Sequence, residues 1–168
     1  MVLVDNERLV NLLGALAVAT GDEITLATNQ FGARRESDAA ALNFIGHAAG
    51  LSVDELSAVM HLSQPATTRL VDRLVEDGFV EKRRGHDHKT IALHLTSSGH
   101  RKRTSVQGAR FRRIAPFFDA LDASERAELE RIVEKMLLST VRDGQHAGSV
   151  CRLCNERACD PCPMDQLV

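Results

Sequence analysis

LSVDELSAVMHLSQPATTRLVDRLVEDGFVEKRRGHDHKTIALHL, residues 51–95, predicts two short helices followed by two strands around a basic loop. Ser52 and Glu55 form an S-x-x-E capping box in front of an apolar run with helical spacing. Ser63 is expected to cap the second helix, and Pro65 is tolerated in its first turn because that N–H has no helical partner. Two helices joined by so short a turn are typical of a helix-turn-helix.

The second helix is expected to be amphipathic and to end at a glycine. Five apolar residues share one face, and five polar residues, among them Thr68, Arg69 and Arg73, lie on the other. Gly78 fits the position just after the helix in a Schellman ending, in which Phe79 folds back on Leu74.

A hairpin with a basic tip follows this helix. Val80–Arg84 has the composition of a short strand, and Ile91, Leu93 and Leu95 alternate with less apolar neighbours, as in a half-buried strand. The connecting RRGHDHK holds five potential cations. A basic hairpin after a helix-turn-helix indicates a winged helix, in which the second helix enters the major groove and the tip contacts phosphates or the minor groove.

The segment TTRLVDRLVEDGFVEKRRGHDHKTIALHLTSSGH resembles the MarR family of bacterial transcription regulators. The matching features are a recognition helix at Arg69–Val80, the pair Arg83–Arg84, a wing tip at Asp87–Lys89 and a strand ending at Leu93–Thr96. The resemblance is specific over residues 52–99 and extends in architecture over residues 5–142. It implies a dimeric regulator of double-stranded DNA. The family's usual wing-tip arginine is here Lys89, which lacks the planar guanidinium fork.

A DNA-binding surface is predicted from this arrangement. Side chains at the start of the second helix would approach base edges, and those farther along it and on the wing would hold phosphates or enter the minor groove. Asp87 would orient the wing tip by pairing with Arg84 or Lys89. The predicted DNA-binding set is Ser63, Gln64, Pro65, Thr67, Thr68, Arg69, Arg73, Arg84, His86, Asp87, His88 and Lys89.

The charge distribution supports a local DNA contact rather than a general polycation. The net charge is −2, but residues 69–113 hold twelve Lys or Arg and five Asp or Glu, a balance of +7. No apolar run approaches the roughly 20 residues needed to span a bilayer, and the N-terminus lacks a signal-peptide pattern. We therefore expect a cytoplasmic protein without a membrane partner.

Long helices are predicted on both sides of the winged region. Residues 5–29 repeat leucine at helical spacing; Ser37 is expected to cap a scaffold helix, and Ser97 or Ser98 a long helix that Pro116 kinks or splits. Asp122 and Glu125 form a capping box for the last helix. The fold class is therefore mainly α (α+β): residues 1–36 and 97–142 form a dimerisation region around a winged helix-turn-helix at residues 37–96, because terminal amphipathic helices need burial that a homodimer supplies.

Residues 143–168 are predicted to be a cysteine-rich metal-binding tail, joined through a flexible segment at residues 143–149. All four cysteines lie there, as C-x₂-C-x₄-C-x₂-C: Cys151, Cys154, Cys159 and Cys162. One metal centre per chain is expected, either an iron–sulfur cluster or zinc. A reversible disulfide switch and stable disulfides are the remaining alternatives. The tail is expected to pack against the dimerisation helices, away from DNA.

The leading hypothesis is a dimeric regulator that binds a palindromic operator and senses redox state or metal through its cysteines. A regulator that responds to a small organic ligand is the alternative, with Phe31, Phe44 and Phe111 as candidate pocket residues and the cysteine site purely structural. A thiol oxidoreductase is disfavoured, because C-x-x-C belongs there at a strand-to-helix turn in a βαβ unit. The sequence also lacks a glycine-rich phosphate loop or paired catalytic carboxylates, so we expect no enzyme activity.

Overall fold

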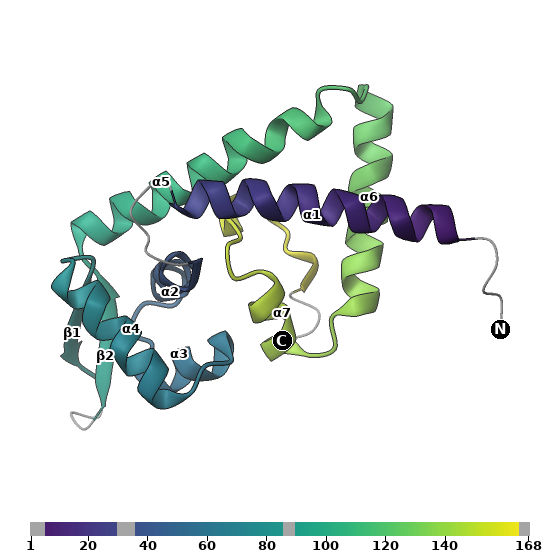
Figure 1. Ribbon diagram of the computed structural model, residues 1–168. Coiled ribbons are helices and arrows are strands. Elements are labelled where there is room, and N and C mark those ends of the chain that lie inside the picture. The colour runs from purple at the N-terminus through teal and green to yellow at the C-terminus, as the bar shows by residue number, and fades with distance from the viewer. Residues whose placement is uncertain (1–5, 30–35, 86–89, 165–168) are drawn as a thin grey trace.

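The computed structural model describes residues 6–29, 36–85 and 90–164 (Figure 1). The chain is mainly helical and carries one two-stranded sheet in this described part. Its elements, in order, are α1 (Glu7–Asn29), α2 (Glu36–His47), α3 (Val53–Met60), α4 (Gln64–Glu76), β1 (Val80–Arg84), β2 (Ile91–Leu95), α5 (Ser97–Ile114), η1 (Ala115–Phe118), α6 (Ala123–Thr140), α7 (Gly144–Val150) and η2 (Glu156–Ala158).

The winged region has one apolar core shared by α2, α3, α4 and the hairpin. Leu42, Leu56, Val71 and Leu93 are at most 1% exposed, each from a different element. The capping box that starts α3 is present: the Ser52 hydroxyl accepts from the N–H of Glu55, and the Glu55 carboxylate accepts from the N–H of Ser52. Mutual burial of these elements therefore fixes the orientation of α4.

Both ends of α4 lie where the sequence predicts them. Ser63 is the N-cap, but its side chain makes no capping hydrogen bond; its carbonyl oxygen accepts from the N–H groups of Ala66 and Thr67. At the other end Gly78 has φ +73° and donates to Val75, and Phe79 donates to Leu74. These two bonds make the predicted Schellman ending.

The hairpin pairs β1 and β2 in antiparallel register from Val80 opposite Leu95 to Arg84 opposite Ile91. The predicted alternation in β2 is only partly right. Leu93 and Leu95 are buried, but Ile91 is 50% exposed and Ala92 is buried. Ile91 stands opposite Arg84 at the outer end of the hairpin and does not belong to the core of the winged region.

Of three further predicted helix boundaries, two need correction and one is confirmed. Ser37 does not cap α2, because the helix already includes Glu36. The cap of α5 is Thr96 rather than Ser97 or Ser98, since the Thr96 hydroxyl accepts from the N–H of Gly99 at 3.0 Å. Pro116 does split the helix, as predicted, and α5 passes into the 3₁₀ segment η1.

The last long helix starts at the predicted capping box. The Asp122 side chain accepts from the N–H groups of Ser124 and Glu125, and the Glu125 side chain accepts from the N–H of Asp122. None of the residues of α6 is fully buried. Its apolar face, which includes Ile132, Val133 and Met136, therefore lacks a complete cover within one chain.

Helix α1 corrects the expectation that no segment is apolar enough to span a membrane. Glu7–Asn29 is the one helix in the described part of the chain that passes this test of length and composition. Residues 6–19 are all exposed, with Leu9 at 62% and Leu16 at 48%. A helix of this kind also fits an interface with another protein surface, because it presents a contiguous apolar face.

The tail is ordered differently from the prediction. Residues 144–150 form the helix α7 instead of a flexible joint, because the Asp143 side chain caps it by accepting from the N–H of His146 at 2.8 Å. Val141, Ala147 and Met164 then form a small apolar cluster that the end of α6 covers. In Figure 1 the tail lies between the winged region and α6.

We predict that Gly99→Ala destabilises the protein by about 1–3 kcal/mol, because a side chain there overpacks a tight contact. A Cβ at Gly99 would lie 2.0 Å from the backbone oxygen of Phe79. Gly108→Ala in the same helix is the matched control, since its Cβ meets only the mobile end of Arg112 at 3.3 Å. Urea unfolding should show the control neutral or up to about 1 kcal/mol more stable. Equal stability of the two variants would contradict the close approach.

Candidate functional site

The N-terminal half of α4 presents an exposed polar surface. Five of the predicted DNA-binding residues lie on it, and all are exposed: Ser63, Gln64, Pro65, Thr68 and Arg69. The Arg69 Nε donates to the carbonyl oxygen of Pro65 at 3.1 Å, and the Gln64 amide donates to Asp54 of α3. These bonds hold both side chains close to the helix surface in the free protein.

Thr67 does not belong to this surface. Its side chain is 0% exposed, and its hydroxyl donates to the carbonyl oxygen of Ser63 at 3.2 Å. Thr67 stands four residues before Val71 and seven before Leu74, which is the spacing of the buried face. A direct approach of Thr67 to base edges is therefore inconsistent with this packing.

Arg73 also has a role other than the predicted phosphate contact. Its Nη2 donates to the Asp38 carboxylate of α2 at 2.9 Å, and the Asp38 side chain is 8% exposed. A half-buried guanidinium that neutralises a buried carboxylate is not free to contact a phosphate without exposing that charge. The pair instead fixes α4 against the scaffold helix α2.

The described part of the wing carries its cations on β1. Lys82 pairs with Asp72 of α4 at 2.7 Å, and Arg83 pairs with Glu81. Arg84 is exposed at the end of the strand, next to the wing tip. The predicted tip residues His86, Asp87, His88 and Lys89 lie outside the described residues.

The four cysteines are all partly exposed, and their thiols interact. A hydrogen bond with Cys154 lowers the pKa of Cys151 to about 7, whereas the same bond raises the pKa of Cys154. Burial and the nearby Cys154 raise the pKa of Cys159. Cys162 acts electrostatically on Cys151. Within the described ranges, no three His, Cys, Asp or Glu side chains stand at the spacing of metal ligands.

The C-x-x-C pair also lacks the surroundings of a thiol oxidoreductase. Cys151 follows the short helix α7. The sheet in the described residues is a single antiparallel hairpin, which lies much earlier in the chain. Thioredoxin-like chemistry uses a strand-to-helix turn in a βαβ unit. The arrangement therefore gives no support to that alternative.

Sequence reasoning missed a polar network that holds the tail. Asn43 of α2 and Arg103, Gln107 and Arg110 of α5 all hydrogen-bond to the tail segment 152–156. The tail does contact α5 of the predicted dimerisation region, as expected, but it also contacts α2 and α3 of the winged region, which was not predicted from the sequence. The one signal in the sequence was Asn43 itself, a polar residue within the apolar run Ala39–Ile45.

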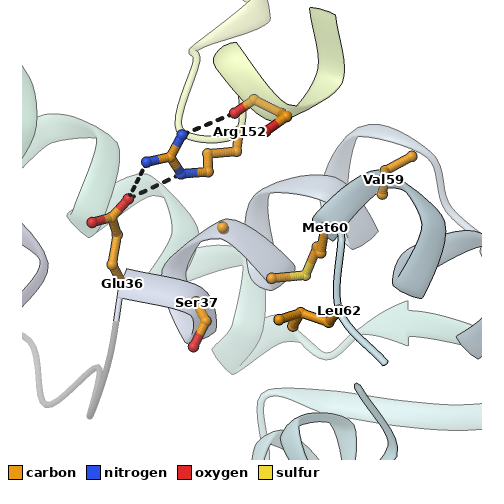
Figure 2. Close-up of a pocket in the computed structure, with 8 residues that line it drawn as sticks. Glu36, Ser37, Val59, Met60, Leu62 and Arg152 are labelled. Atoms are coloured by element: carbon orange, nitrogen blue, oxygen red, sulfur yellow. Dashed lines mark hydrogen bonds and ion pairs between the residues drawn. The ribbon is translucent and has the colours of Figure 1, made fainter. Parts of the chain in front are cut away.

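Figure 2 shows a half-open pocket of about 200 Å³ between α2, α3 and the tail. Val59, Met60 and Leu62 form its apolar wall, and Arg152 and Glu36 meet at its edge at 2.7 Å. Of the predicted pocket residues, Phe44 packs on the winged core and Phe111 is 72% exposed. Neither lines this pocket, and Phe31 lies outside the described residues.

The winged region matches a known family. Residues 35–89 match the model of the MarR family. The transcriptional repressor MprA of Escherichia coli (strain K12) is 31% identical over 84 residues, which cover 49% of this chain and 48% of MprA. The chain thus aligns with about half the length of that relative.

The fold matches solved structures over most of the chain. A MarR family protein from Bacillus stearothermophilus aligns with a TM-score of 0.69 and 26% identity, over 82% of this chain and 99% of that one. The Mycobacterium tuberculosis MarR family protein Rv2887, in complex with DNA, aligns with a TM-score of 0.62 and 20% identity, over 75% of this chain and 94% of that one. The predicted fold class is confirmed, and the winged region matches the MarR family model.

Proposed function

We propose that this chain, whose winged region is of the MarR type, is a dimeric transcription regulator that binds a palindromic operator in the cytoplasm. The observation that carries this proposal is the exposed N-terminal half of α4, which stands on the MarR fold as a recognition helix. Gln64, Thr68 and Arg69 read base edges in the major groove. Arg84 and the wing tip at residues 86–89 contact phosphates or the minor groove.

Selection from random DNA duplexes tests this function, and we predict that it yields a palindrome. Arg69→Ala should weaken binding to that duplex by about 1–3 kcal/mol and relax the preference at one base pair, because a bidentate base contact is lost. The matched control is Arg131→Ala on α6, whose guanidinium pairs with Glu128 away from α4. Fluorescence anisotropy measures both variants. Equal losses of Arg69→Ala on selected and random DNA would show a phosphate contact only.

The dimer follows from the apolar surface that one chain leaves exposed. Leu9, Leu12, Leu13 and Leu16 form a stripe along α1 and are 46–62% exposed. In Figure 1 the N-terminal part of α1 extends past α6 without another element around it. A second copy supplies the missing cover and presents two recognition helices to half-sites about 34 Å apart.

We predict that the double variant Leu12→Glu with Leu16→Glu is a folded monomer. Both side chains are already exposed in one chain, so the change costs the monomer little, whereas a dimer interface would bury two carboxylates. Val18→Glu is the control, because Val18 lies on the face of α1 opposite Leu9 and is 67% exposed. Sedimentation velocity should show wild type and control as dimers. A dimeric double variant, or a monomeric wild type, would contradict the proposed interface.

The proposed dimer holds one metal centre per chain in its cysteine tail, either zinc or an iron–sulfur cluster, which senses metal or redox state. The donors would be the four thiols, which lie within one short segment and interact with one another. Metal binding would draw them closer together than they stand in the described residues. The buried Nε of Arg110 supports the same proposal: it has no hydrogen-bond partner among the described residues, and Arg110 acts electrostatically on Cys151, Cys154 and Cys159. Thiolates would give this cation a counter-charge.

We predict that Cys154→Ser and Cys159→Ser, one from each C-x-x-C pair, each abolish metal binding, because a four-thiolate site loses a ligand. Ser149→Ala, just before the first pair, is the control that leaves every thiol in place. Elemental and sulfide analysis of protein purified without oxygen distinguishes the two metals, since only the cluster contains sulfide. Full metal content in both cysteine variants would exclude the shared site.

A second candidate signal is a small organic ligand in the pocket of Figure 2, with the cysteine site purely structural. The observation that favours it is an apolar wall of Val59, Met60 and Leu62 next to a paired arginine, Arg152. A ligand with a carboxylate could compete with Glu36 for that guanidinium. Operator binding that responds to such a ligand, but not to loss of metal, would favour this candidate.

A further inference from the structure

Asn43 of α2 is a buried amide whose four hydrogen-bonding positions are all filled. It is 8% exposed. Its Nδ2 donates to the carbonyl oxygens of Arg152 at 3.2 Å and Cys154 at 2.8 Å. Its Oδ1 accepts from Arg103 at 3.0 Å and Gln107 at 2.8 Å. Three elements of the chain, α2, α5 and the cysteine tail, therefore meet at one side chain.

Helix α5 holds the same short piece of tail from the other side. Gln107 donates to the carbonyl oxygen of Cys154 at 3.2 Å, and Arg110 donates to that of Leu153 at 2.9 Å. Arg103 binds both carboxylate oxygens of Glu156, and its own side chain is 12% exposed. Three consecutive carbonyl groups, at residues 152–154, are thus fixed by side chains of α2 and α5.

These carbonyl groups belong to the first C-x-x-C loop. The N–H of Cys154 donates to the carbonyl oxygen of Cys151 at 2.7 Å, which closes the loop into a turn. A soft metal ion that draws the two sulfur atoms together, or a bulky group added to them, strains this tight turn when rotation of the cysteine side chains alone does not accommodate it, and the strain is relieved by rotation of the peptide groups between them. This rotation therefore disturbs the hydrogen bonds that Asn43 donates.

Helix α2 in turn contacts the recognition helix. Asp38 lies five residues before Asn43 on α2 and pairs with Arg73 of α4 at 2.9 Å. Arg152 of the loop also binds Glu36, at the start of α2, at 2.7 Å. The loop is thereby joined to α4 through α2 within a single chain, without use of the dimer interface.

We infer that the loop Cys151–Cys154 holds α2 in place through its hydrogen bonds with Asn43, an arrangement that we call the latch. Soft metal ions or thiol-directed electrophiles at the two sulfurs break these hydrogen bonds and thereby control DNA binding. This inference rests on the proposed DNA-binding function and names its regulation. The latched state holds α2, and with it α4, at a fixed position against α5. Release removes the hold of the loop on α2, which lets α2 and α4 shift, and weakens operator binding.

Asn43→Asp tests the latch in the full-length chain. The carboxylate keeps both acceptor contacts with α5 but has no N–H to donate to the loop, so the variant is permanently unlatched. Ala48→Asp, exposed just after α2, is the charge-matched control. Arg152→Ala, which removes the exposed contact with Glu36 and leaves Asn43 intact, is a second variant that keeps the test valid if the buried carboxylate impairs folding.

The probes are iodoacetamide, which alkylates the four cysteines, and Zn²⁺ alone. Alkylation should weaken binding of wild type to the selected duplex at least fivefold, the lower end of typical allosteric coupling. Before alkylation, the affinity of Asn43→Asp for the duplex should already be as low as that of alkylated wild type. Alkylation should then change the affinity of this variant less than twofold. The affinity of unalkylated Arg152→Ala should lie between those of wild type and Asn43→Asp. The control Ala48→Asp should have the affinity of wild type before and after alkylation. Zn²⁺ should lower the affinity of wild type and of the control for the duplex, but it should leave the affinity of Asn43→Asp unchanged.

Hydrogen exchange separates the latch from the proposed function. Alkylation should speed amide exchange in α2 of wild type, and this readout needs neither an operator nor a metal. An Asn43→Asp variant with the full wild-type response would overturn the inference, as would unchanged α2 exchange in alkylated wild type. Failure to select any duplex would instead contradict the regulator, and absence of metal would contradict only the cysteine centre.

Discussion

The apolar core of the winged region is the constraint on which the rest of the molecule depends. Leu42, Leu56, Val71 and Leu93 each come from a different element and exclude water from one shared volume. Burying such side chains is worth about 1.5–3 kcal/mol each. Because the buried face of α4 fixes the position of the helix, its exposed residues can vary without loss of this packing. The Asp38–Arg73 pair adds direction to this packing, since it joins α2 and α4 at one point.

Local structure in this chain was predictable wherever the signal lay within a few residues. The two capping boxes, the end of α4 at Gly78 and the break at Pro116 are all of this kind. Thr67 was wrongly predicted on the DNA-binding surface, although its spacing to Val71 and Leu74 places it on the buried face. Its hydroxyl can be buried because it donates to the carbonyl oxygen of Ser63. Polar character was there a poorer guide than helical position.

The tail could not be predicted in this way. Asn43 contacts residues 109 and 111 positions later in the chain, and no local pattern encodes such a pairing. The supposed flexible joint at residues 143–149 is a helix because a single aspartate caps it, in spite of two glycines. The choice among zinc, a cluster and free thiols is likewise a matter of chemistry that spacing alone leaves open.

The way in which the tail is held has a consequence for how such a protein can diversify. Asn43, Gln107 and Arg110 bind main-chain carbonyl groups, which every amino acid provides. The grip is therefore largely indifferent to which side chains occupy residues 152–154. A tail with different thiol spacing or different ligands could be held by the same hydrogen bonds if its backbone followed the same turn. The sequence of the tail can therefore change while the residues of α2 and α5 that hold it stay the same.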